Sequence, residues 1–192
     1  MDNINNSNKK TDFIRTYTGK DFYSLEPDMN SVDIYDIAHA LSMLCRGNGQ
    51  LKNFFSVGQH CVNCCIEAQA RGYSDRLILA CLLHDASEAY MSDVPRPLKN
   101  FMPEYREAED KLIESVYTKY LGSPLTDEEM SLVKQIDDDM LYFDLKNLLN
   151  FDTPDEEPEM KTSFSQETEP FHVTEKKYLE LFFKYIDKYA GI

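Results

Sequence analysis

The feature that most constrains the fold is the spacing of apolar residues, which repeats with the period of an α-helix along most of the chain. In "SVDIYDIAHALSMLC", residues 31–45, apolar side chains recur three, four and seven positions apart, so they share one side of a helix. The same spacing predicts helices that begin near residues 56, 75 and 103. It predicts two more, one that follows a capping box formed by Thr126 and Glu129 and one that has Thr174 as its N-cap. Because strand-like alternation is slight, the sequence predicts an all-α fold.

Three segments depart from this pattern. In "FIRTYTGKDFYSLEP", β-branched and aromatic residues flank a Thr-Gly-Lys turn, which predicts a short N-terminal arm or hairpin. Residues 1–12 are rich in polar residues and are expected to be a disordered tail, while the acidic, Pro-containing residues 151–172 are expected to be a surface loop. The length favours one domain over residues 13–192, with residues 173–190 as its last helix.

Composition narrows the class of protein. The net charge of −14, from 34 acidic and 20 basic residues, argues against a broad surface for nucleic acid or an anionic membrane, because such surfaces neutralise phosphates. The chain has no long apolar run, so no transmembrane helix is expected, and its polar first residues are not expected to be a secretory signal peptide. Its five cysteines are odd in number and lie in apolar stretches, which favours reduced core thiols, and the Cys61–Cys64 spacing lacks the second pair of a zinc finger. We therefore expect a cytoplasmic protein.

Several polar residues occupy helix sides that should be buried. The segment "LILACLLHDASEAYMSDVPRP", residues 77–97, is predicted to be helical as far as Asp93, where its prolines end the helix, and His84 and Asp85 continue its inward side. His60 lies next to the apolar stripe of the preceding helix, and Asp137 interrupts the stripe of a later one. Asp144 follows Asp137 on nearly the same face, two turns on. Because an unpaired buried charge is costly, such groups are expected to pair with one another or to bind a metal.

Two imidazoles and two carboxylates from three helices would form a suitable site for a divalent transition metal. Such an ion acidifies a water molecule and polarises a substrate oxygen. Alternatively, each of these side chains is an ordinary hydrogen-bonded core residue. The residues by themselves leave both interpretations open.

The order His60, His84-Asp85 and Asp137 resembles the H…HD…D signature of the HD-domain phosphohydrolases. The longer stretches "FFSVGQHCV", "LLHDASEAYMSDVPRPLK" and "LVKQIDDDML" are similar to the subgroup of bacterial 5'-deoxynucleotidases and phage-encoded HD hydrolases that act on deoxynucleotides. "IRTYTGKDFYSLEP" and "VDIYDIAHALSMLCR" resemble the phage-type members, so the likeness spans roughly residues 13–150. It implies an HD-domain helical bundle with a short N-terminal arm or hairpin.

The resemblance also implies one bound divalent ion, which could be Mn²⁺, Co²⁺, Mg²⁺, Zn²⁺ or Fe²⁺. Asp138 and Asp139 are rivals for the last ligand position, and Asp137 is preferred because it continues the buried face of its helix. The residues that match the four metal ligands of the family are His60, His84, Asp85 and Asp137.

Further residues match the family's catalytic and substrate-binding positions. Glu88 matches an acid three residues after the His-Asp pair, and Asp93 matches a second acid that lies near the scissile phosphate in relatives. Arg46 matches an arginine that contacts substrate, whereas Arg96 and Lys99 are expected either to hold phosphate or to be ordinary surface charges. Phage-type relatives tend to carry "CRFGGH" where this chain has "CRGNGQ", so the base preference stays open.

The function implied by the resemblance is metal-dependent hydrolysis of a small nucleotide substrate. The simplest case is a 5'-deoxynucleotidase, which converts a deoxyribonucleoside monophosphate to deoxyribonucleoside and phosphate. One alternative is a deoxynucleoside triphosphate triphosphohydrolase, which would use the same ligands, and another is a non-catalytic HD module that binds nucleotide or metal. The complete set of matching residues favours an enzyme. The aromatic last helix could pack inside the monomer or join two copies in a homodimer.

Overall fold

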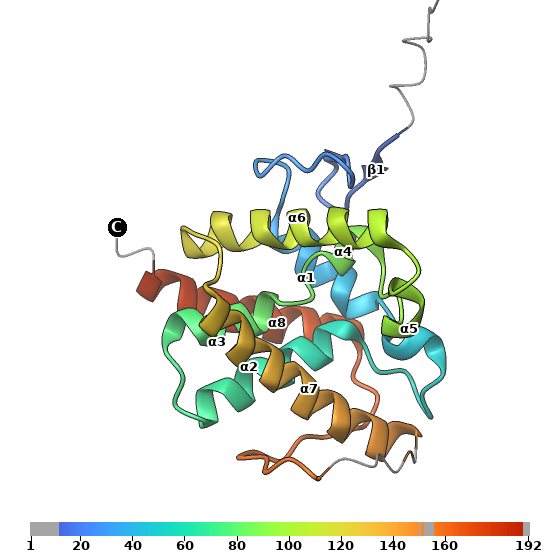
Figure 1. The fold of residues 1–192 in the computed structure, drawn as a ribbon, viewed down its shortest axis with the longest axis vertical. Helices are drawn as coiled ribbons and strands as arrows, with labels where there is room; N and C mark the ends of the chain where they lie inside the picture. The colour runs from blue at the N-terminus through green and yellow to red at the C-terminus, as the bar shows by residue number, and fades with distance from the viewer. Residues whose placement is uncertain (1–11, 150, 152–155, 190–192) are drawn as a thin grey trace, which may run out of the picture.

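The computed structural model describes residues 12–149, 151 and 156–189, and helices make up nearly all of the regular secondary structure in this part of the chain (Figure 1). The predicted all-α class and N-terminal hairpin are therefore confirmed. Strands β1 (Ile14–Arg15) and β2 (Asp21–Phe22) pair antiparallel. Gly19 has a φ of 83° in the turn between them, a conformation that glycine adopts without steric cost. Apart from Asp12, the expected tail lies outside the described residues.

Most of the described helices follow one another after a few residues, but a long segment separates the last two. They are α1 (Ile34–Met43), the 3-10 helix η1 (Arg46–Gly49), α2 (Val57–Ala70), α3 (Asp75–Leu83), α4 (Glu88–Met91), α5 (Arg96–Lys99), α6 (Pro103–Leu121), α7 (Asp127–Leu149) and α8 (Phe171–Tyr189). Among them, none combines the length and the apolar character that are needed to cross a bilayer.

Side-chain caps fix the starts of three of these helices as predicted. The hydroxyls of Ser56 and Ser74 accept the backbone N–H groups three residues further on, at 3.0 and 3.3 Å, and so begin α2 and α3. At the start of α7, the Thr126 N–H donates to the Glu129 carboxylate at 3.0 Å, and the Glu129 N–H donates to the Thr126 hydroxyl at 3.2 Å. This reciprocal pair is the predicted capping box.

One prediction around residues 84–99 is wrong, and one short helix there was not predicted. Helix α3 ends at Leu83 instead of continuing to Asp93, because the amides of Ala86 and Glu88 bond three residues back, at 2.9 and 3.0 Å, and so form tight turns. The sequence did not indicate the short helix α5, which begins directly after Pro95. Pro97 lies in the first turn of α5, where its missing N–H needs no partner.

The start of the last helix also differs from the prediction. Helix α8 begins at Phe171, and Thr174 is a buried residue inside it whose hydroxyl donates to Glu169 at 2.8 Å. Before α8, the described residues 156–170 contain neither helix nor strand and run along α2. The buried Glu67 carboxylate of α2 accepts the backbone N–H groups of Lys161 and Thr162, at 2.9 and 3.2 Å, and so ties this segment down.

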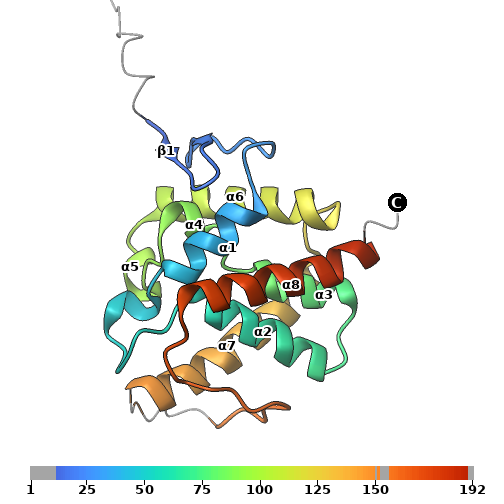
Figure 2. The same cartoon turned by 180° about the vertical axis from the view of Figure 1, so that it is seen from behind.

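Helices α2 and α3 pack against each other in the centre of the molecule. Helices α1 and α8 cover one side of this pair, and α7 lies on the opposite side (Figures 1 and 2). Aromatic residues of α8 fill the first contact, and the Tyr178 hydroxyl donates to the Leu82 carbonyl at 2.8 Å. The second contact contains the predicted functional residues.

Candidate metal centre

The four predicted metal ligands converge where α2, the end of α3 and α7 meet. The rings of His60 and His84 lie 5.2 Å apart, centroid to centroid. Asp137 Oδ1 lies 3.1 Å from His60 Nε2 and 3.6 Å from His84 Nε2. Asp85 Oδ2 lies 3.3 Å from His84 Nε2 and 3.9 Å from His60 Nε2. Two imidazole nitrogens and two carboxylates therefore face one another in a small volume.

The second nitrogen of each histidine is held in place, which orients the ring. His84 Nδ1 donates to the Cys81 carbonyl at 2.8 Å, so its Nε2 atom can present a lone pair. His60 Nδ1 lies 3.0 Å from Asp144 Oδ2, a contact in which the ring N–H donates to the carboxylate. Supporting contacts of this kind orient metal-binding histidines. His84 Nε2 itself is buried and has no hydrogen-bond partner among the described residues.

Two thiols lie against the same cluster. Cys64 Sγ is 3.5 Å from His60 Nε2, and Cys61 shares a second set of possible ligand atoms with His84 and Asp85. The first set consists of His60, Cys64 and His84. Within each of the two sets, the possible ligand atoms lie within 4.8 Å of one another. The structure thus contains a His/Cys/Asp cluster that could hold a metal ion. Each of the five cysteines is free, and burial raises the pKa of Cys61 to about 11 and that of Cys64 well above its usual value.

Arg46, in η1, partly balances the negative charge of the cluster. Its Nε atom lies 3.3 Å from Asp144, and its Nη1 and Nη2 atoms lie 3.5 Å from Asp85 and 3.8 Å from Asp137. Burial by itself would lower the pKa of Arg46, but these three carboxylates raise it. The predicted substrate-binding arginine therefore lies directly beside the predicted ligands.

The opposite charges also shift the ligands themselves. Burial opposes ionisation of Asp85, but the neighbouring His84 lowers the pKa of this carboxyl to about 2. Burial likewise opposes ionisation of Asp137, but the neighbouring His60 and His84 imidazoles hold its pKa well below the usual value. Against the effect of burial, Asp85 raises the pKa of His84 well above that of a free histidine. Both carboxylates are consequently ionised at neutral pH.

The three consecutive acids of α7 point in different directions. Asp138 pairs with Arg96, at 2.7 Å, and with Lys134 on the outside of the helix. Asp139 pairs with Arg71 at 2.7 Å. Asp137 faces both histidines, so the geometry favours it over its two rivals.

The predicted catalytic acids lie beside the cluster without joining it. Glu88 is buried, and its Oε1 atom lies 3.5 Å from Lys99 Nζ, while its Oε2 atom has no hydrogen-bond partner among the described residues. Burial, together with the nearby Asp85 and Asp93, raises the pKa of Glu88 well above its usual value. Asp93 Oδ2 accepts the Gly47 N–H at 3.0 Å and so anchors the η1 loop that carries Arg46.

The two predicted phosphate-holding cations are paired with acids. Lys99 contacts Glu109 at 2.6 Å as well as Glu88, and Arg96 contacts Asp137 and Asp138 although its side chain is 53% exposed. Both lie on the same side of α5, three residues apart. Arg96 contacts the predicted ligand Asp137, and Lys99 contacts the predicted catalytic acid Glu88. Neither is a solitary surface charge.

Two residues of the site received no role from the sequence. Asp144 was visible as a polar residue seven positions after Asp137, and this spacing could have identified it as a supporting group. Cys64 lies four residues after His60 and therefore on the same side of α2, but its apolar surroundings favoured a core role.

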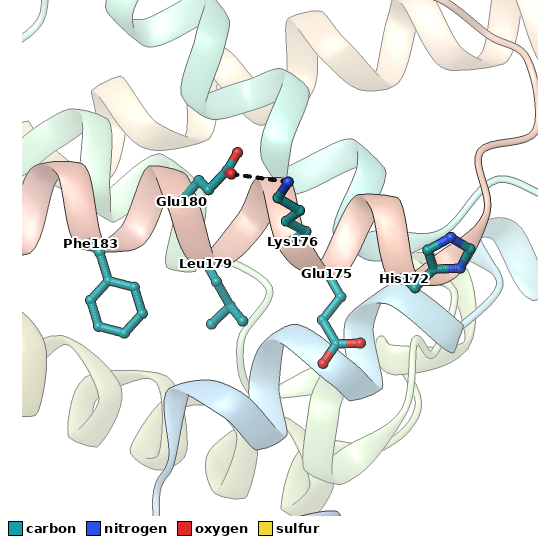
Figure 3. Close-up of a pocket in the computed structure, with 6 residues that line it drawn as sticks. All are labelled: His172, Glu175, Lys176, Leu179, Glu180 and Phe183. Atoms are coloured by element: carbon teal, nitrogen blue, oxygen red, sulfur yellow. Dashed lines mark ion pairs between the residues drawn. The ribbon is translucent and has the colours of Figure 1, made fainter.

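A surface hollow on α8 is separate from this cluster (Figure 3). Its lining residues all belong to α8, and none is a predicted site residue. They are His172, Glu175, Lys176, Leu179, Glu180 and Phe183.

Fold and site together define an all-α protein with a buried His/Cys/Asp cluster that could bind a metal ion. No protein-family model matches the chain. It is 39% identical over 108 residues to YfdR, an uncharacterized protein of Escherichia coli (strain K12), with 56% of this chain and 58% of YfdR covered. It is 34% identical over 112 residues to an uncharacterized protein of Rhodobacter capsulatus, with 55% and 57% covered. The matched part is thus less than two thirds of either relative.

Proposed function

We propose that this protein is a divalent-metal-dependent phosphohydrolase of the HD type that acts on nucleotides, most simply as a 5'-deoxynucleotidase. The observation that carries the proposal is the convergence of His60, His84, Asp85 and Asp137 from three parts of the chain. Arg46 adds a cation to the cluster, and Glu88 adds a buried carboxyl of raised pKa beside it.

The residues fit a divalent ion. Imidazole nitrogens together with carboxylates suit transition metals such as Mn²⁺, Co²⁺, Zn²⁺ and Fe²⁺, and carboxylates also suit Mg²⁺. The buried His84 Nε2 atom lacks a hydrogen-bond partner among the described residues, and it could coordinate such an ion. When bound, a divalent ion would supply Lewis-acid stabilisation of the phosphoryl group and of the attacking water.

Arg46 is suited to binding the phosphate. Its guanidinium is held among three carboxylates and is 12% exposed, so its position is determined before substrate arrives. A planar guanidinium can donate two parallel N–H groups to phosphate oxygens. Asp93 supports this role by holding the backbone next to Arg46, through the Gly47 N–H.

Glu88 is suited to transferring a proton to the leaving group. Burial and two neighbouring acids raise its pKa, so the carboxyl keeps its proton at higher pH than an exposed glutamate does. A protonated carboxyl beside the phosphate can donate to the departing nucleoside oxygen, which otherwise leaves as an alkoxide. Lys99, 3.5 Å from Glu88, adds positive charge on the same side.

The proposal is tested by product analysis of the full chain with Mn²⁺, Co²⁺ or Mg²⁺. We expect deoxyribonucleoside and phosphate from a deoxyribonucleoside monophosphate. Triphosphate released from dATP would instead identify the triphosphohydrolase alternative, and nucleotide binding without hydrolysis would identify a non-catalytic module.

Matched histidine variants show whether the activity belongs to this site. His84→Ala should lower kcat/KM by about a thousandfold, or about 4 kcal/mol in transition-state stabilisation. His172→Ala, at an exposed position on α8, should leave it unchanged. Equal activity of wild type and His84→Ala would overturn the assignment of the site.

A further inference from the structure

We propose that Cys64 is an additional ligand of the metal ion and makes the centre selective for thiophilic ions such as Zn²⁺ and Co²⁺ over Mg²⁺ and Mn²⁺. This inference rests on the metal centre of the proposed function. It assigns a ligand outside the His/Asp set that the sequence motif predicts.

The position of Cys64 allows it to share an ion with the histidines. Cys64 lies one helical turn after His60 on α2, is fully buried, and has its Sγ atom 3.5 Å from His60 Nε2. The possible ligand atoms of His60, Cys64 and His84 lie within 4.8 Å of one another. Zinc bonds to nitrogen and sulfur are about 2.0–2.3 Å long, so two ligands of one ion lie up to about 4.6 Å apart. Small shifts of these side chains therefore suffice for one ion to contact all three.

A second observation, independent of the thiol, also indicates a cation at this point. The His84 side chain is 8% exposed, and its Nδ1 atom is occupied by the Cys81 carbonyl at 2.8 Å. Its Nε2 atom lacks a hydrogen-bond partner among the described residues. A buried imidazole nitrogen that can present a lone pair, and that lies close to a thiol and to another imidazole, is suited to metal binding.

The other buried cysteines provide a competitor and a control. Cys61 shares a set with His84 and Asp85, but that set does not include His60. Cys64 is favoured because its set contains both histidines. Cys65 is equally buried, belongs to neither set, and is therefore the matched control.

The chemistry of the ligand determines the selectivity. Thiolate sulfur is a soft donor that favours zinc, cobalt and iron, whereas Mg²⁺ takes oxygen ligands and dehydrates reluctantly. The Cys64 thiol would lose its proton to solvent as the sulfur–metal bond forms. A centre with the Cys64 thiolate would therefore bind Zn²⁺ and Co²⁺ more tightly than Mg²⁺ and Mn²⁺.

Cobalt absorption tests the ligand directly. The metal-free full chain is loaded with Co²⁺, and its spectrum is compared with those of Cys64→Ser, Cys61→Ser and Cys65→Ser. We expect a sulfur-to-cobalt charge-transfer band in the wild type and in Cys61→Ser and Cys65→Ser, and its loss in Cys64→Ser. A band that persists in Cys64→Ser, or that disappears in Cys61→Ser alone, would overturn the assignment of Cys64.

A measurement on the wild type avoids any folding defect of the variants. X-ray absorption of the Zn²⁺-loaded protein should show one sulfur at about 2.3 Å from the metal. Calorimetry should show that Cys64→Ser weakens Zn²⁺ binding by about 10- to 100-fold, comparable to the loss of a group that supports a metal site, with Mg²⁺ binding unchanged. If a metal binds through the histidines with nitrogen and oxygen ligands alone, the Cys64 inference fails while the metal centre stands. If no Co²⁺ or Zn²⁺ binds, both fail.

Discussion

Helices α2 and α3 contact α8 on one side and α7 on the other, and these two contacts differ in chemistry. Toward α8, the contact is filled by the buried rings of Tyr178, Phe182 and Tyr185. Toward α7, pairs of polar and ionisable side chains join the helices in addition to buried apolar residues. These pairs are His60 with Asp137 and Asp144, Arg71 with Asp139, and Arg76 with Glu129.

The difference indicates that the contact with α8 mainly stabilises the fold, whereas the contact with α7 holds the side chains that could carry out chemistry. Burying an aromatic ring is favourable whatever its exact orientation, because the gain scales with the apolar area removed from water. Burying charged pairs gives little net stability, because desolvation offsets much of their attraction. Buried apolar residues of α7, such as Val133, Ile136 and Met140, hold this helix in place. Asp137 and Asp144 are therefore not needed to attach the helix and can take part in metal binding.

The largest expected effect is on the α8 side. Phe182→Ala removes a ring that is 3% exposed and should lower the free energy of unfolding by about 3–5 kcal/mol, through lost burial and the cavity that remains. Phe183→Ala, one position further and 40% exposed, should cost about 1 kcal/mol or less. Denaturant unfolding of both variants measures the difference. Similar losses would contradict the view that this contact stabilises the fold through buried area.

A smaller effect is expected on the α7 side, and it should appear in metal affinity. Asp144→Asn weakens the contact that orients the His60 ring, so metal binding should weaken by about 10- to 100-fold, or about 1.4–2.7 kcal/mol. Asp139→Asn, also on α7, removes one of the two carboxylates that pair with Arg71 and should leave metal affinity unchanged. Calorimetric titration with Co²⁺ compares the two variants. Equal weakening would show that any acid lost from α7 disturbs the site.

The smallest expected effect is a change in the pH dependence of stability. Burial, Asp85 and Asp93 raise the pKa of Glu88 in the folded protein above the value of 4.5 expected for the unfolded chain. The folded state therefore binds this proton more tightly, and the resulting stability is complete below pH 4.5 and is lost as pH rises through the folded pKa.

Glu88→Gln removes this titration. Stability of the metal-free variant should fall less than that of the wild type as the pH rises from acidic to neutral. Urea unfolding over a series of pH values measures the two slopes. Identical slopes would mean that Glu88 ionises in the folded protein as readily as in the unfolded chain.

Features that depend on neighbouring residues were predictable from the sequence. The apolar periods and the caps at Ser56, Ser74 and Thr126 correctly indicated α2, α3 and α7, because helix formation and capping involve groups within about four positions. The same local rules failed at residues 84–87, where turns replace the predicted helix. Those turns place the His84 ring where its Nδ1 atom meets the Cys81 carbonyl.

By itself, the sequence determined that the chain is helical, that a short arm or hairpin precedes the helices, and that polar residues interrupt its apolar stripes. Tertiary structure decided which of those polar residues meet. Asp137, Asp138 and Asp139 have the same side chain, but successive residues on a helix point about 100° apart. Asp137 therefore faces the histidines, whereas Asp138 lies on the outside of the helix and Asp139 pairs with Arg71. The roles of Asp144 and Cys64 likewise depend on how α7 and the end of α3 lie against α2. That arrangement is set by contacts between residues far apart in the chain, which local periodicity does not specify.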